Sequence, residues 1–130
     1  MASVRKEIEI NAPAAAVWDA IRDVGAAHVR LFPGVLADVV LEDDVRTATF
    51  ANGLVVREPI VSVDDAQMRF AWAAVGGRAT HYNASLQVYA TGDRSSRVVW
   101  IADFLPNEIG GTIDGLMTAG SAVMKAALER

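Results

Sequence analysis

The last stretch of the chain, residues 107–130, reads NEIGGTIDGLMTAGSAVMKAALER. Its apolar residues recur at steps of three and four, which is the spacing that gathers side chains onto one face of an α-helix. They are Ile109, Ile113, Leu116, Met117, Gly120, Val123, Met124 and Ala127. Asn107 is a suitable N-cap, and Pro106 separates the helix from the segment before it. The pattern predicts one long amphipathic helix whose apolar face must be covered by another element.

The rest of the chain predicts strands, with two short helices near its beginning. Residues 3–10 alternate charged and apolar side chains, as in a half-buried strand. Short helices are predicted at 14–22, after Pro13, and at 26–32. Later segments rich in β-branched residues are separated by Asp, Asn and Gly, which favour turns. The strands predicted there are 36–42, 46–50, 54–63, 68–74, 80–91 and 97–105.

The predicted sheet and the predicted helix can bury each other. An antiparallel sheet with one buried face needs a cover, and the helix at 107–130 is the only element long enough to provide it. A chain of 130 residues is most economically a single domain, spanning residues 1–130. We therefore predict an α+β fold in which a seven-stranded, curved antiparallel sheet wraps around the long C-terminal helix.

The composition excludes several classes of protein. The chain has no cysteine, which removes disulfide frameworks, thiol nucleophiles and thiolate metal sites. Its formal net charge is -4 and its 12 basic residues are dispersed, so no nucleic-acid partner is expected. No apolar run is long enough to cross a bilayer, and the first residues lack the apolar stretch of a secretory signal. We expect a cytoplasmic protein with no integral membrane association.

Short segments along the whole chain carry a resemblance to a known family. They are IEINAP at 8–13, VW at 17–18, FPGV at 32–35, VRE at 56–58 and SRVVW at 96–100. With its order of elements, the chain resembles the START/birch-pollen-allergen-like (SRPBCC) superfamily, in particular its bacterial polyketide cyclase/dehydratase and lipid-transport-like branch. The resemblance implies a helix-grip fold with a cavity between the concave sheet face and the long helix. It also implies a hydrophobic or aromatic ligand, lipid-like or polyketide-like, without specifying which.

Strand parity indicates which side chains face that helix, because neighbouring residues point to opposite sides of a sheet. In the strand at 80–91, Tyr82 is predicted to face inward, whereas His81 and Asn83 face outward, which argues against catalytic roles for the latter two. The predicted ligand-binding residues combine the inward strand positions with the apolar helix face. They are Phe70, Trp72, Tyr82, Trp100, Ile113, Leu116, Met117 and Gly120.

Arg57 and Glu58 are neighbours in the strand at 54–63, so one of these two charges must face inward. An inward Glu58 would have a raised pKa and can act as a general acid or base. An inward Arg57 can instead hold a ligand carboxylate or an enolate. The alternative is that both lie at a solvated surface. Parity alone leaves these possibilities open.

His28 is the third catalytic candidate. It falls in the second short helix, which the family resemblance places at the mouth of the cavity, and histidine can shuttle protons near pH 7. A partly exposed helix histidine can also be without function. The histidines and acidic residues show no metal-ligand spacing, so neither a metal nor another cofactor is expected.

Two functions remain open, and binding is favoured because no constellation of acid, base and oxyanion donors stands out. The first is a non-catalytic carrier or sensor of the hydrophobic ligand. The second is a cyclase or dehydratase that uses Glu58 or Arg57 with Tyr82 or His28. A third possibility is a stress-type or partner-binding protein whose cavity is incidental. The chain can be a monomer or a homodimer, and the only hint of a dimer surface is the outward pair Val99 and Ile101.

The long helix also predicts where a ligand gains access. Gly110 and Gly111 weaken its first turn, since each glycine lowers helix propensity by roughly 1 kcal/mol relative to alanine. Residues 106–112, facing the short helix around His28, are therefore predicted to form a gate. Gly120 is predicted to mark a close approach between the helix and the sheet.

Overall fold

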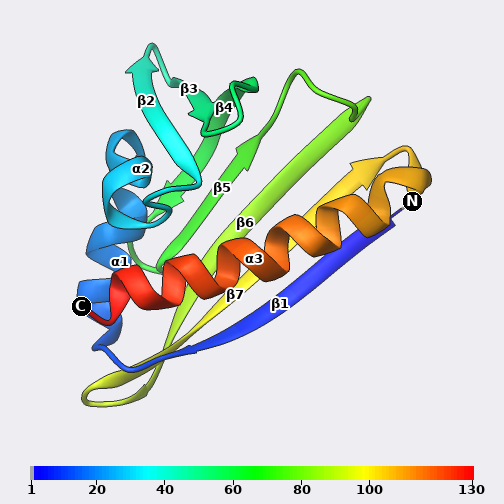
Figure 1. Ribbon diagram of the computed structural model, residues 1–130. Helices are drawn as coiled ribbons and strands as arrows, with labels where there is room; N and C mark the ends of the chain where they lie inside the picture. Colours follow the sequence, from blue (N-terminus) through cyan, green and yellow to red (C-terminus); the bar gives the residue numbers. More distant parts are fainter. Residues whose placement is uncertain (1) are drawn as a thin grey trace.

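The structure of the protein is a computed structural model that describes residues 2–130. Its elements follow the predicted order (Figure 1). They are β1 (Ala2–Ile10), α1 (Ala14–Arg22), the 3-10 turn η1 (Val24–Ala26), α2 (Ala27–Arg30), β2 (Leu36–Glu42), β3 (Val45–Phe50), β4 (Val55–Asp64), β5 (Arg69–Ala73), β6 (His81–Gly92), β7 (Ser95–Leu105), the 3-10 turn η2 (Asn107–Ile109) and α3 (Gly110–Leu128). The α+β helix-grip prediction is confirmed.

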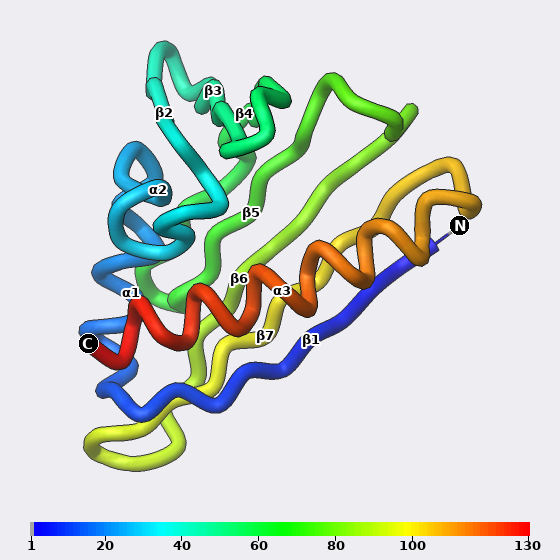
Figure 2. Tube along the Cα trace, in the orientation of Figure 1, coloured from blue at the N-terminus to red at the C-terminus, as the bar shows by residue number. Residues whose placement is uncertain are grey.

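The strands form one 7-stranded antiparallel sheet in the order β1-β7-β6-β5-β4-β3-β2. The sheet curves, and α3 runs along β1 on its concave side, while α1 and α2 lie near the C-terminal end of α3 (Figures 1 and 2). Register shifts in β4 between Ile60 and Ser62, and in β2 between Leu36 and Asp38, contribute to this curvature because a bulge bends its strand.

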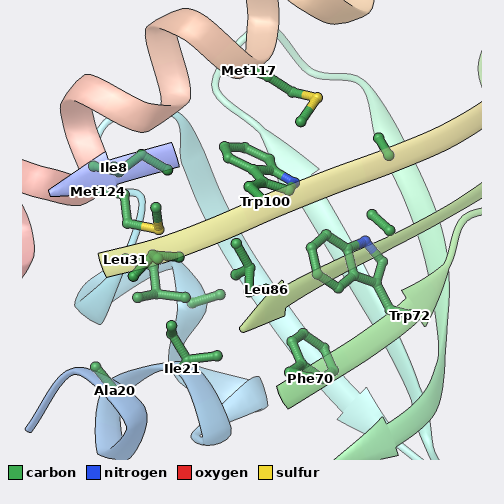
Figure 3. Packing of buried hydrophobic residues seen from close by; sticks show 14 of the residues in the cluster. Ile8, Ala20, Ile21, Leu31, Phe70, Trp72, Leu86, Trp100, Met117 and Met124 are labelled. Atoms are coloured by element: carbon green, nitrogen blue, oxygen red, sulfur yellow. The ribbon is translucent and has the colours of Figure 1, made fainter. Parts of the chain in front are cut away.

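Side chains fill the concave face of the sheet beneath α3. In β7, Trp100 and the apolar residues that share its strand parity are all buried. They are Val98, Trp100, Ala102 and Phe104. Figure 3 shows Trp100 lying below Met117 of α3, with Phe70 and Trp72 on the neighbouring part of the sheet. The core therefore sits between the concave face, α3 and the two short helices.

The predicted apolar face of the long helix is too wide. Leu116 is 61% exposed, whereas its neighbour Met117 is 2% exposed. Successive residues of a helix point about 100° apart, so a helix that contacts the sheet along a narrow stripe can bury only one of the two. The placement of Leu116 on the buried face is therefore wrong.

The predicted gate is also misplaced. In the antiparallel pairing of β1 with β7, Ala2 lies opposite Phe104. The chain after β7 is thus at the beginning of β1, whereas α1 and α2 follow the end of β1. Residues 106–112 consequently lie at the far end of the molecule from His28, as Figure 2 shows for the tube. A gate formed by these residues against α2 is not possible in this arrangement.

The structure also bears on the possible dimer surface at Val99 and Ile101 and on the expectation of no membrane-spanning segment. Val99 is buried within the single chain, flanked in the register by Gln87 and Glu7, so it offers no exposed apolar surface for a dimer. Ile101 is half-buried. Within residues 2–130, no helix combines the length and apolar character needed to cross a membrane.

Candidate functional site

A buried ion pair on the concave face is the centre of the candidate site. Arg46 of β3 and Glu58 of β4 lie directly opposite each other in the register. The Arg46 Nε donates a hydrogen bond to the Glu58 Oε1 at 2.8 Å, and the two residues are only 5% and 9% exposed. Arg57, next to Glu58 in β4, is exposed. Of the two alternatives for this strand, the structure therefore supports Glu58 as the inward charge.

The Arg46 guanidinium is held by aromatic rings as well as by Glu58. Its central carbon lies 5.2 Å from the centre of the Phe70 ring and 5.6 Å from that of Trp72. These two rings stack on each other, with centres 4.9 Å apart and an interplanar angle of 18°. The Arg46 Nη1 also donates to the backbone carbonyl of Val24 in η1 at 3.2 Å. The guanidinium is therefore fixed in position, because it lies against two aromatic rings and donates to both the Glu58 carboxylate and the Val24 carbonyl.

Sequence reasoning overlooked Arg46, although a signal was present. Arg46 has the same strand parity as Ala48 and Phe50, so it is a charge on an otherwise apolar face. Parity applied to this strand indicates an inward arginine. The identity of its partner depends on the pairing of β3 with β4, which parity within one strand does not provide.

Burial dominates the electrostatics of this site. Loss of solvent raises the pKa of Glu58, while the charge and hydrogen bond of Arg46 and a hydrogen bond from the Trp72 indole oppose that rise. The pKa of Tyr82 is also raised, first by burial and then by the negative charge of Glu58. Glu58 can therefore exchange a proton nearer neutral pH than an ordinary glutamate. Arg46 supplies a fixed positive charge, and Tyr82 supplies a neutral hydroxyl.

His28 lies apart from this ion pair. It belongs to α2, which packs against α3. Its Nδ1 is buried and has no hydrogen-bond partner among the described residues, and no hydrogen bond of that part of the chain joins it to Glu58. His81 and Asn83 lie on the outer face, where the His81 Nε2 and the Asn83 Oδ1 are 2.7 Å apart and the Asn83 Nδ2 donates to Asp103 at 3.3 Å.

Most of the predicted ligand-binding residues come together on the concave side. Those that are buried are Phe70, Trp72, Trp100, Met117 and Gly120, and those that are half-buried are Tyr82 and Ile113. A Cβ atom added to Gly120 would lie 3.2 and 3.3 Å from two ring carbons of Trp100. The predicted close approach of α3 to the sheet at Gly120 is confirmed. The roles of these residues as ligand contacts stay predictions.

Side chains on the concave face beneath α3 have almost no accessible surface, since Phe70, Trp72 and Met117 are only 1%, 5% and 2% exposed. Hollows on the surface lie elsewhere. One is lined by residues of α1, η1 and α2 with Leu41, and another by residues 11–13 with Asp93 and Arg94. Neither includes Arg46 or Glu58. A ligand that binds against the ion pair must therefore displace side chains.

The fold and the buried ion pair define a helix-grip domain with a charged site on the concave face of its sheet. Over residues 1–130 the chain matches the family described as polyketide cyclase/dehydrase and lipid transport, and it belongs to that family. This result confirms the resemblance seen in the sequence. No curated protein matches the chain.

The same fold occurs in several solved structures. An uncharacterized protein from Bacillus thuringiensis has a TM-score of 0.89 at 20% identity, with 98% of each chain covered. The di-domain ARO/CYC protein BexL, from the BE-7585A biosynthetic pathway, has a TM-score of 0.86 at 14% identity, covering 98% of this chain and 46% of BexL. Norcoclaurine synthase from Thalictrum flavum, in complex with dopamine and hydroxybenzaldehyde, has a TM-score of 0.75 at 21% identity, covering 98% of this chain and 83% of the synthase. Identities this low establish a shared fold only.

Proposed function

We propose that this protein binds a hydrophobic small molecule, aromatic or lipid-like, between the concave face of the sheet and α3. The observation that carries the proposal is the buried Arg46–Glu58 pair beside the stacked rings of Phe70 and Trp72. Removing two charges from water is costly, and apolar residues of similar size often stabilise a core equally well or better. A pair kept at this place is therefore suited to meet a polar group on an otherwise apolar ligand.

The relatives favour an aromatic ligand over a purely aliphatic one. The norcoclaurine synthase structure contains dopamine and hydroxybenzaldehyde, and BexL is named as an ARO/CYC protein. In this chain, Phe70, Trp72 and Trp100 offer ring faces on the same concave surface. Flat ligands can stack on such faces with more specificity than an alkyl chain.

Binding requires a space that the side chains of α3 now occupy. Met117 and Met124 are the large buried side chains of α3, and both are unbranched. Methionine has three rotatable bonds and adapts easily to a new surface. We infer that a ligand is admitted by displacement of these side chains, without unfolding of the helix.

A cyclase or dehydratase activity is the second candidate, and the burial of the Glu58 carboxyl beside the Arg46 guanidinium is the observation that favours it, because burial raises the pKa of this carboxyl. A glutamate with such a pKa can remove a proton from a carbon between two carbonyl groups. Arg46, whose guanidinium is fixed beside it, can stabilise the resulting enolate, and Tyr82 can donate to a carbonyl oxygen. Glu58 is thus the proposed acid or base, and His28 and Arg57 are not required for it.

Binding is tested with two probes of different class, anthracene-2-sulfonate and palmitate. Tryptophan fluorescence quenching and the shift in melting temperature report on each, and we expect saturable binding of at least one probe. Arg57→Met, on the outer face, should bind as the wild type does. The double variant Arg46→Met/Glu58→Leu should bind the sulfonate about tenfold more weakly, because it lacks the fixed cation. The proposal fails if neither probe binds and native mass spectrometry of protein from its own host reveals no co-purified apolar molecule.

Catalysis is tested with Glu58→Gln on a linear poly-β-ketone, by following the absorbance of aromatic product. The proposed role predicts a loss of turnover of about 100-fold or more, since a positioned acid or base contributes on this scale. Arg57→Met serves as the control and should keep the wild-type rate. Equal rates in Glu58→Gln and the wild type would rule out Glu58 as the acid or base.

A further inference from the structure

The indole N–H of Trp100 is buried without a hydrogen-bond partner. Trp100 is 8% exposed, and no acceptor among the described residues reaches its Nε1. An indole N–H can only donate, and buried donors in folded proteins are almost always paired. The group is therefore a donor that lacks an acceptor in the protein itself.

The direction of this N–H is fixed by packing on the opposite edge of the ring. The six-membered ring edge of Trp100 lies so close to α3 that a Cβ atom on Gly120 would be 3.2 Å from it. The Phe32 ring lies against the same side chain, with centres 5.6 Å apart. Figure 3 shows the indole nitrogen pointing away from Met124 and toward Trp72, below Met117. A ring wedged in this way cannot turn to find another partner.

Small residues line the sheet in front of the N–H. Ala84 of β6 and Ala102 of β7 lie opposite each other in the register, and Trp72 of β5 is the next residue in the same row. Leu86 and Trp100 form the adjacent row. Ala84 and Leu86 of β6 therefore lie between the two indoles, and the row of Ala84 and Ala102 presents only methyl groups beside Trp72. Both alanines are almost completely buried.

Met117 of α3 lies above Trp100 in Figure 3 and is itself 2% exposed. Because its side chain is unbranched, it can turn aside without a change in the helix backbone. That movement would open a space beside the Trp100 N–H. The resulting slot would be flat, with an indole at each side and one fixed donor.

The geometry points to Trp100 as the specificity-determining donor for a flat aromatic ligand that carries a ring carbonyl oxygen. The ligand lies over Ala84 and Ala102, in the place vacated by Met117, and its carbonyl oxygen accepts from the Trp100 Nε1. This inference rests on the proposed binding function and adds a ligand class to it. A ring system without an acceptor leaves the N–H unpaired, which is the physical basis of the discrimination.

The experiment compares anthraquinone-2-sulfonate with anthracene-2-sulfonate. The two probes share a flat three-ring frame and the same charge, and they differ in the two ring carbonyls. We expect the wild type to bind the quinone about five- to tenfold more tightly, as one buried hydrogen bond implies. Trp100→Phe should bind both probes with equal affinity. Its melting temperature should fall, because the smaller ring leaves a cavity against Gly120 and Phe32, so the ratio of the two affinities is the readout that reports on the donor.

Trp18→Phe is the matched control. The Nε1 of Trp18, in α1, already donates to the Asp65 Oδ1 at 2.9 Å, so this indole has no donor left for a ligand. This variant should lose stability and keep the preference for the quinone. In nitrogen–proton correlation spectra of the wild type, the chain's 3 tryptophans should give one indole signal each. The Trp100 signal should shift downfield with the quinone and not with anthracene-2-sulfonate.

The possible results separate this inference from the proposed function. Equal affinities of the two probes for the wild type, or a preference that survives in Trp100→Phe, would overturn the role of Trp100 and leave binding itself intact. Failure of both probes to bind would overturn the inference and count against the proposed aromatic ligand as well. Loss of the preference in Trp18→Phe would also contradict a donor located at Trp100.

Discussion

The Arg46 guanidinium donates to the Glu58 carboxylate at 2.8 Å, inside a face of the sheet that is otherwise apolar. Each charge offsets the cost of burying the other, and both side chains are largely shielded from solvent. Arg46 also rests against Phe70 and Trp72, so the ion pair is joined to the aromatic part of the core. This relationship determines both the stability of the site and its chemistry.

Removing one partner of this ion pair should be much more harmful than removing both. Arg46→Met leaves a buried carboxylate without its cation and should lower the free energy of unfolding by about 3–5 kcal/mol. Adding Glu58→Leu removes the isolated charge and should restore most of that loss. Urea unfolding followed by circular dichroism measures both variants. Arg57→Met, at an exposed position, should change the free energy of unfolding by less than about 0.5 kcal/mol. A double variant no more stable than Arg46→Met would contradict this account.

The raised pKa of Glu58 predicts a particular dependence of stability on pH. In the unfolded chain the pKa of Glu58 is near 4.5, so the glutamate loses its proton around that pH. In the folded protein its pKa is higher, so it still holds the proton there. The folded state then binds more protons than the unfolded state, so stability falls as the pH rises from about 4.5 through the raised pKa. Urea unfolding at a series of pH values should show a shallower fall for Glu58→Gln than for the wild type. An identical slope in the two proteins would exclude a raised pKa at this position.

Asp65 predicts the opposite dependence. It accepts hydrogen bonds from the Arg22 Nε at 2.8 Å and from the Trp18 Nε1 at 2.9 Å, and these lower its pKa below the ordinary 3.8. Its stabilising contribution is complete above that ordinary value and is lost as the pH falls through the lowered pKa. Asp65→Asn should therefore be less stable than the wild type at pH 7, and the difference should shrink toward pH 2. A difference that stays constant over this range would contradict the role of the charge.

Substitution by alanine should have opposite effects on stability at two glycines of α3. At Gly115 a Cβ atom meets nothing within 4 Å, so Gly115→Ala should stabilise the protein by up to about 1 kcal/mol through helix propensity. At Gly120 the Cβ atom would lie 3.2 Å from the wedged ring of Trp100. Gly120→Ala should lower the free energy of unfolding by about 1–2 kcal/mol, because overpacking outweighs the gain in propensity. Thermal unfolding of both variants measures the contrast, and a stabilised Gly120→Ala would show that the helix can move away from the sheet.

The sequence by itself determined the elements and their order. The predicted ranges 14–22 and 36–42 agree with α1 and β2 to the residue, because helix periodicity, strand alternation and turn residues are local properties. The burial of Trp100 and the outward position of His81 followed from strand parity. The family resemblance also rested on short local segments, such as IEINAP at 8–13.

Only the tertiary structure decided which charge faces the core and what it meets there. Parity places Arg57 and Glu58 on opposite faces but cannot identify the concave one, and the pairing of β3 with β4 brings Arg46 to Glu58. The rotation of α3 about its axis, which exposes Leu116 and presses Gly120 onto Trp100, likewise depends on contacts with a distant strand. These features arise from contacts between residues far apart in the chain. A local sequence pattern contains no information on the distances between such residues or on how closely their side chains pack.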